Sequence, residues 1–121
     1  MTVLATPATP LGSRRSLAIR AAKISLRAVI EARDTANYVE RTLDWKRLPQ
    51  SFGYRAEVRR ALDNVCAALE ARHEAARAVA GHYDPELFPL AHEAWTRTAD
   101  VAWRERMKWA VLRSDVQRAG L

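Results

Sequence analysis

Cysteine, glycine and long apolar runs are all scarce in this sequence. The single cysteine, Cys66, excludes an internal disulfide, and the glycines do not form a Gly-rich phosphate-binding loop. No stretch approaches the roughly 18 apolar residues that a membrane-spanning helix needs. Residues 1–12 lack the cationic and apolar regions of a signal peptide. We therefore expect a cytoplasmic protein that does not enter a membrane.

Positive charge, by contrast, is abundant. The chain has 20 Lys and Arg residues against 14 Asp and Glu, which gives a formal net charge of +6. The excess is concentrated toward the N-terminus, because residues 1–50 hold nine basic and four acidic residues. A charge balance of this kind favours anionic partners such as nucleic acids or acidic proteins.

Apolar spacing and turn residues predict three long helices. They cover about residues 13–43, 51–80 and 84–118, with Ser13, Ser51 and Asp84 as N-cap candidates and Pro85 opening the third helix. Each would be roughly 45 Å long, and short connections make neighbouring helices antiparallel. We predict an all-α fold: an elongated antiparallel bundle of three long helices, or of four if one breaks. This domain would occupy residues 13–121, after an extended or disordered tail over residues 1–12.

The first helix is apolar over a wide arc. Leu17 and Ile24 lie on one side of this arc, and Ile19, Leu26 and Ile30 extend it around the other. A helix with so wide an apolar arc contacts more than one neighbour. We therefore expect this helix to be central in the bundle or part of an oligomer interface.

The other two helices carry narrower apolar seams. In the second helix, alternating steps of three and four residues predict a buried face made of Val58, Leu62, Val65, Leu69, Ala76 and Val79. In the third helix, a seven-residue repeat predicts a seam made of Phe88, Trp95, Ala102, Trp109 and Val116. A second line, Leu87, Ala94 and Val101, runs beside that seam. Cys66 falls beside the buried face of the second helix and is expected to be a small core residue.

Residues 13–29 contain five basic residues and no acidic one. Two of the cations occupy a helix N-terminus, where negative charge is normally favoured, so we consider an anion site there. The other three follow a stripe at i, i+3 and i+7 that can track a phosphate backbone. A fraying end and a solvated face are the alternatives. The five residues are Arg14, Arg15, Arg20, Lys23 and Arg27.

A second basic segment is interleaved with aromatic residues. Aromatic rings beside cations can stack bases while the cations bind phosphate. The alternative is that these rings close the end of the core, which we favour for Tyr54 but leave open for Trp45. The candidate contacts in this segment are Trp45, Lys46, Arg47, Arg55, Arg59 and Arg60.

The sequence offers little sign of catalysis or metal binding. His73 and His92 each begin a near match to the HExxH zinc motif, but Arg77 and Thr96 stand where the second histidine is required. We therefore predict no metal, no cofactor, no small-molecule substrate and no enzymatic activity. Trp103 lies one position off the seven-residue seam, so it packs on a second neighbour or marks a partner surface.

Arg77 and His82, separated by four residues, resemble the Arg-x4-His motif of HEPN domains. These domains are all-α, and many are toxins or defence nucleases. The resemblance covers residues 77–82 alone, and Ala78 replaces the polar residue that usually follows the arginine. It would imply an RNase whose active site forms across a dimer, with Arg77 and His82 acting on RNA.

The residues therefore favour a non-enzymatic, basic helical-bundle protein that binds DNA or RNA through the phosphate backbone. We expect it to be a small subunit or accessory factor of a larger nucleoprotein complex, with protein partners or self-association. One alternative is a helical adaptor or homo-oligomer that binds an acidic protein partner. The other alternative is the HEPN-like RNase.

Overall fold

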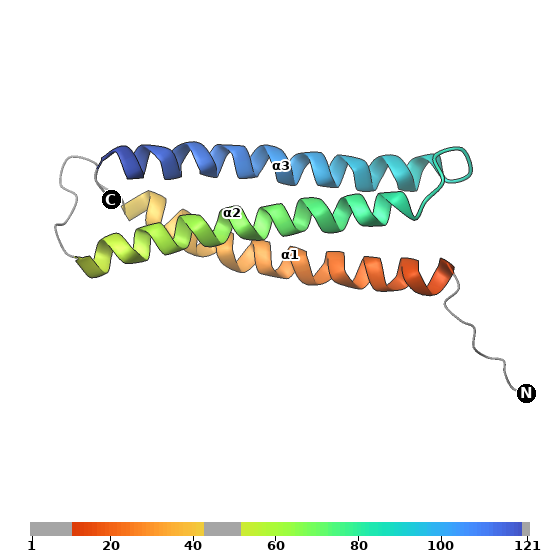
Figure 1. Cartoon of the computed structure of the whole chain (residues 1–121), viewed down its shortest axis with the longest axis horizontal. Helices are drawn as coiled ribbons and strands as arrows, with labels where there is room; N and C mark the ends of the chain where they lie inside the picture. The colour runs from red at the N-terminus through yellow and green to blue at the C-terminus, as the bar shows by residue number, and fades with distance from the viewer. Residues whose placement is uncertain (1–10, 43–51, 120–121) are drawn as a thin grey trace, which may run out of the picture.

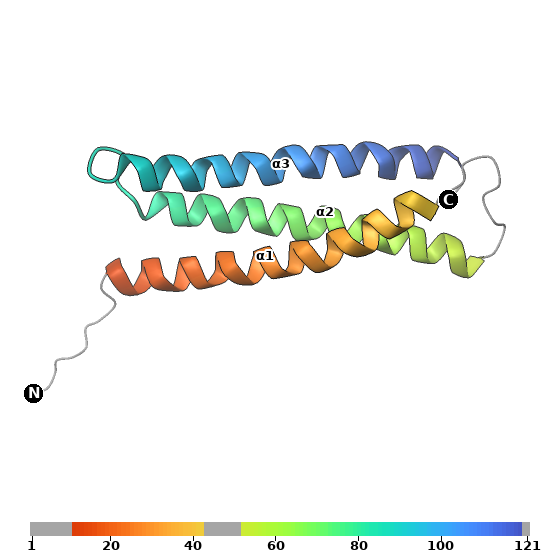
Figure 2. The ribbon, with the colours of Figure 1, turned by 180° about the vertical axis from the view of Figure 1, so that it is seen from behind.

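The computed structural model describes residues 11–42 and 52–119, which form a bundle of three helices (Figure 1). Helix α1 spans Leu11–Thr42, α2 spans Phe52–Gly81 and α3 spans Pro89–Arg118, with no strand in these ranges. Successive helices run in opposite directions, as Figure 2 shows from behind. The prediction of an all-α antiparallel bundle is confirmed.

Helix α1 begins at Leu11, two residues before the predicted cap at Ser13. The predicted tail otherwise lies outside the described residues. None of the described helices combines the length and the apolar character needed to cross a membrane.

The central helix of the bundle is α2. It lies between α1 and α3 in both ribbon views and packs against each of them (Figures 1 and 2). In the described segments, no Cα atom of α1 comes within 8 Å of a Cα atom of α3. Of the two places predicted for the first helix, the central one is therefore wrong, and the oligomer interface stays a prediction.

Helix α1 has a narrow buried face, and this explains its place at the side of the bundle. The face is a single line made of Ala22, Ser25, Val29, Ala36 and Val39. Ser25 is accommodated there because its hydroxyl donates to the Ala22 carbonyl oxygen at 2.6 Å. The flanks of the wide apolar arc remain in solvent: Leu17 is 61% exposed and Ile24 is 65% exposed.

The core is formed largely by α2. All six residues predicted for its buried face, from Val58 to Val79, are buried. Cys66 is buried among them as predicted, and burial raises the pKa of its thiol. On α3, three members of the predicted seam (Ala102, Trp109 and Val116) are buried, whereas Trp95 is half-buried. The first member, Phe88, is exposed because it precedes the helix.

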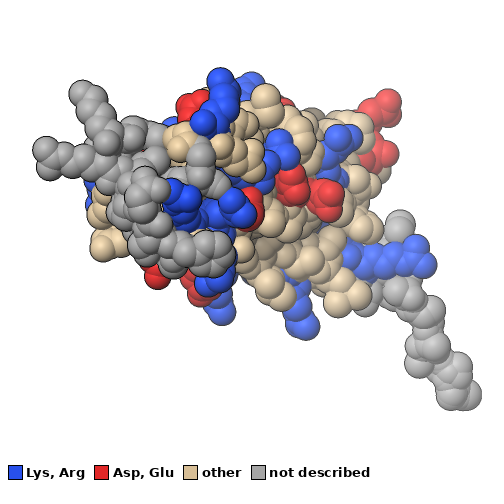
Figure 3. Space-filling view, turned by 60° about the vertical axis from the view of Figure 1, so that its left-hand side comes forward, with Lys and Arg blue, Asp and Glu red and all other residues tan. Residues whose placement is uncertain are grey.

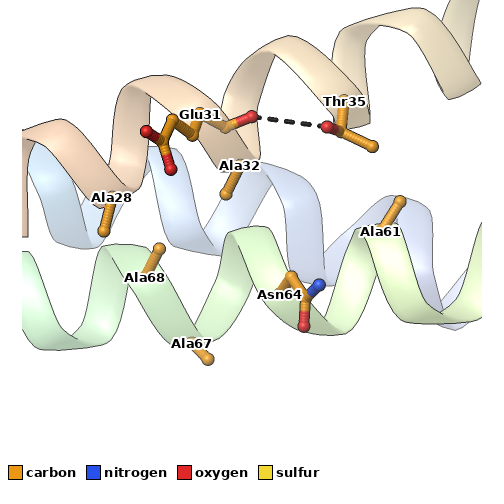
Figure 4. Close-up of a pocket in the computed structure, with 8 residues that line it drawn as sticks. All are labelled: Ala28, Glu31, Ala32, Thr35, Ala61, Asn64, Ala67 and Ala68. Carbon is orange, nitrogen blue, oxygen red and sulfur yellow. Dashed lines mark hydrogen bonds between the residues drawn. The ribbon is translucent and has the colours of Figure 1, made fainter.

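Alanine side chains line the contact between α1 and α2. In Figure 4, Ala28 and Ala32 of α1 face Ala61 and Ala68 of α2 across the space between the two helices. Such small side chains let two helix axes approach closely. The abundance of alanine in the sequence is therefore used at this contact.

The start of α3 differs from the prediction. The Asp84 carboxylate accepts hydrogen bonds from the backbone N–H of Glu86 at 2.7 Å and of Leu87 at 3.2 Å, but this forms only an isolated turn. The turn does not continue into the helix because Pro89 has no N–H to donate to it. Helix α3 begins instead at Pro89, where the fixed φ of proline suits the first helical position. Its first turn contains no acidic residue.

Candidate functional site

The outer side of α1 carries an exposed row of cations. Arg20, Lys23 and Arg27 are exposed, and their spacing places successive charges roughly 4.5 and 6 Å apart along the helix axis. Arg14 is also exposed, but it lies six residues before Arg20 and therefore on another side of the helix. At the lower right of Figure 3, where the N-terminal half of α1 lies, basic groups project from the surface without acidic groups beside them. We call Arg20, Lys23 and Arg27 the α1 basic face.

Among the described side chains, no carboxylate forms an ion pair with the α1 basic face. Helix α3 takes part in each of the five ion pairs between described side chains, and no member of the face takes part in one. The pairs are Arg33–Glu105, Arg97–Glu93, Arg106–Glu70, Arg113–Asp63 and Arg118–Asp115. The basic residues of α3 are thus largely compensated, whereas those at the start of α1 present their charge to solvent.

Arg15 does not belong to the α1 basic face. Its guanidinium carbon lies 4.5 Å from the ring centroid of Tyr83 and 5.4 Å from that of Phe88. The two rings pack edge to face on each other, with their centroids 5.9 Å apart. Cation–π contacts of this kind fasten the start of α1 to the connection between α2 and α3. An anion site formed by Arg14 and Arg15 stays a prediction.

The second predicted basic surface is only partly within the described residues. Trp45, Lys46 and Arg47 lie outside them, as does the side chain of Tyr54. Arg55 is half-buried, whereas Arg59 and Arg60 are exposed on the first turns of α2. That Trp45 and these cations act together stays a prediction.

A groove between α1 and α3, which the sequence analysis did not predict, is the other distinctive surface. Leu26 and Val29 of α1 form one wall, Ala94 and Val101 of α3 form the other, and Leu69 of α2 lies beneath them. Its volume is about 350 Å³. The sequence signals were the second line of apolar residues on α3 and the extra apolar flank of α1. Their meeting across α2 required the tertiary structure.

The polar pair Arg33 and Glu105 bridges this groove. Arg33 donates from Nε to Oε2 of Glu105 at 2.8 Å and from Nη2 to Oε1 at 2.7 Å, and the indole N–H of Trp109 donates to Oε2 at 3.2 Å. Burial by itself would raise the pKa of Glu105, but the hydrogen bonds and the charge of Arg33 outweigh it, so the pKa is lowered. The pair joins two helices whose backbones do not meet.

Arg72 lies at the base of the groove and has no acidic partner among the described residues. Its Nη1 donates to the Ala22 carbonyl oxygen at 2.7 Å. Burial lowers the pKa of the guanidinium, and no carboxylate offsets that effect. A half-buried cation is therefore held beside apolar side chains by a hydrogen bond to backbone.

Trp103 contacts α2, the same helix against which the α3 seam packs, and it is 41% exposed; that it marks a partner surface stays a prediction. Its ring centroid lies 5.0 Å from that of His73 on α2, and the guanidinium carbon of Arg106 lies 4.9 Å from it. The His73 Nδ1 donates to the Ala99 carbonyl oxygen at 2.8 Å, which holds the imidazole between α2 and α3. His73 therefore has a structural role in joining these two helices.

That Arg77 and His82, the residues of the HEPN-like motif, act together on RNA stays a prediction. Arg77 lines a hollow together with His92 and Asp100, and His82 is not among the residues lining it. Within the described ranges, no group of three or more His, Cys, Asp or Glu side chains is arranged to hold a metal ion.

Comparison of the chain with protein-family models, with curated proteins and with solved structures gave no match. The α1 basic face and the groove are therefore interpreted from their own geometry.

Proposed function

We propose that this protein binds nucleic acid, without catalysing a reaction, through the α1 basic face. The observation that supports the proposal is an exposed row of cations with no carboxylate paired to it in the described part of the chain. The row runs along one helix, so its charges lie on a line. Phosphates of a nucleic-acid strand also recur along a line, and arginine and lysine side chains can bind successive phosphates.

Binding of this kind depends strongly on salt concentration and only weakly on nucleotide sequence. Each phosphate contact releases condensed counterions, which contributes about −0.9 for duplex DNA or about −0.7 for a single strand to the slope of log K against log salt. Three contacts from the α1 basic face give a slope of about −2 to −3. Phosphates carry no direct sequence information, so we expect similar affinities for unrelated sequences.

We further propose that the protein acts as a subunit or accessory factor of a larger nucleoprotein complex. The basic face covers one side of α1, and exposed aliphatic side chains, among them Leu17 and Ile24, lie beside it. Contiguous exposed apolar surface is typical of protein–protein contact sites. Nucleic acid and a protein neighbour would then be bound by adjoining surfaces.

Fluorescence anisotropy with labelled single- and double-stranded DNA and RNA, at low and moderate salt, tests the proposal. The variant Arg20→Gln/Lys23→Gln/Arg27→Gln removes three charges from the α1 basic face. A control, Arg104→Gln/Lys108→Gln/Arg118→Gln, removes three charges from exposed positions on α3.

We expect the α1 variant to lose at least tenfold in affinity at low salt and to reduce the salt slope by about 2 to 3. The α3 control should lose much less. Equal losses in the two variants would mean that net charge alone, and not the α1 basic face, determines binding. If the wild-type protein binds none of the four probes at low salt, the proposal is wrong.

A further inference from the structure

The groove between α1 and α3 leaves apolar side chains in solvent along both of its walls. Val101 on the α3 wall is 54% exposed, and Leu26 on the α1 wall is also exposed. The α3 wall continues toward the start of that helix with Leu90, one turn before Ala94, and Leu90 is exposed as well. The residues of α3 that line the groove run from Ala94 to Glu105, which corresponds to roughly 17 Å of helix. That length suits about three turns of a partner helix.

The groove is also unevenly charged. Glu105, the one carboxylate that lines the groove, pairs with Arg33, and Arg97 on the α3 wall pairs with Glu93, which lies outside the lining. Arg72 at the base has no carboxylate partner in the described chain. The groove therefore has unpaired positive charge at its base, and a negatively charged group of a partner could pair with it.

Further cations border the two walls. On α1, Lys23 is exposed three residues before Leu26 and so lies on a neighbouring side of the helix. On α3, Arg104 and Lys108 are exposed three and seven residues after Val101, near the same wall. An occupant of the groove would thus have an apolar floor beneath it and positive charge on both sides.

We propose that the groove binds one amphipathic α-helix of an acidic partner protein. The apolar face of this helix would pack on Leu26, Ala94 and Val101, and one carboxylate would pair with Arg72. Acidic residues on the flanks of the helix would face the cations on the two walls. Lys23 borders both surfaces, but this inference does not rest on nucleic-acid binding, because Arg72 and Val101, which test it, line the groove and do not belong to the α1 basic face.

A second copy of this chain fits the groove poorly. The exposed face of α1 that a copy would offer carries Arg20, Lys23 and Arg27. Those charges would be placed beside Arg72 and the cations of the α3 wall, and like charges in a contact oppose association. An acidic helix meets the same surface with opposite charge.

The test is selection from a displayed library of 16-residue helical peptides against the folded full chain. Apolar residues are fixed at i, i+4, i+7 and i+11, and the other positions vary among Glu, Lys, Gln and Ala. Selected peptides are then synthesised, and their affinities are measured by anisotropy. The protein variants are Val101→Glu, in the groove, and Val111→Glu, an exposed valine on the same helix that is 60% exposed and does not line the groove.

We expect the selected peptides to be rich in Glu, and we expect Val101→Glu to weaken their binding at least tenfold while Val111→Glu changes it less than threefold. Arg72→Gln should weaken the Glu-rich peptides more than versions with Gln in place of Glu. Both valines are on the surface, so a loss of folding does not confuse the comparison.

Four results would overturn the proposal. The first is that no peptide is enriched, and the second is that peptides without acidic residues bind as well. The third is that both valine variants weaken binding equally. The fourth is that sedimentation shows a homodimer that Val101→Glu dissociates, which would make a second copy the occupant. Nucleic-acid binding by the α1 basic face can fail or succeed independently of each of these.

Discussion

Replacement of Glu105 by Gln tests how the two outer helices are joined. In the wild-type structure the Glu105 carboxylate accepts two hydrogen bonds from Arg33 and one from Trp109, and it is the link between α1 and α3 across the groove. Glutamine keeps the size of the side chain but removes the charge and one of the acceptor oxygens. The variant therefore perturbs the link without opening a cavity.

The expected loss of unfolding free energy is about 1–2 kcal/mol. Hydrogen bonds to charged groups contribute about 1.5–3 kcal/mol each at partly buried positions. The lower estimate applies here because the Arg33 side chain is 38% exposed, so that solvent screens the pair and glutamine retains some of the bonding. A double-mutant cycle with Arg33→Gln should give a coupling energy of about 1 kcal/mol.

Urea unfolding followed by far-ultraviolet circular dichroism, at neutral and acid pH, measures this effect. The pKa of Glu105 is lower in the folded state than in the unfolded chain, where it is about 4.3. The contribution of the carboxylate is thus complete above about pH 4.3 and is lost as the pH falls through the folded pKa. The difference between wild type and Glu105→Gln should shrink on acidification. A coupling energy below about 0.3 kcal/mol, or a difference that persists unchanged in acid, would refute the reasoning.

Three other predictions concern stability and reactivity. Leu62→Ala should reduce the unfolding free energy by about 3 kcal/mol because Leu62 is fully buried. Leu17→Ala, at an exposed position, should change it by less than about 0.5 kcal/mol. Equal effects of the two variants in urea titrations would contradict the described core. Burial and a raised pKa should make the Cys66 thiol unreactive toward a disulfide reagent until the protein unfolds, so rapid labelling of the native protein would argue against this packing. Asp84→Ala removes the acceptor of two backbone N–H groups and should cost about 1 kcal/mol, which thermal unfolding can detect; Asp84→Asn, which keeps an acceptor, should cost less.

The start of α3 lies later in the sequence than predicted because the chain carries two signals for a helix start. Asp84, Pro85 and Glu86 have the residue types of a helix start, and Asp84 does cap a turn. A second proline five residues after Asp84 interrupts the hydrogen bonding of that turn and provides a better first position for a long helix. The sequence contained both signals, and the later one prevailed because it is followed by an uninterrupted helical segment.

The sequence by itself determined the three helices and the buried face of α2, which forms most of the core. The spacing of apolar residues in α2 is a local property of one helix, so it could be read without knowing the neighbours, and each predicted position proved to be buried. The outward direction of Arg20, Lys23 and Arg27 follows for the same reason, because residues at i, i+3 and i+7 share one side of a helix.

Only the tertiary structure decided which apolar surfaces are covered and which charges are paired. The wide apolar arc on α1 indicates that this helix can make contacts, but it does not indicate how many helices are present to make them. In the structure α2 has two neighbours and is therefore the central helix. Two contacts join residues that are far apart in the sequence: Arg15 with its two aromatic rings, and Arg33 with Glu105. Neither contact can therefore be recognised from a local sequence pattern. The groove over Arg72 has the same origin, because it is formed by side chains from all three helices.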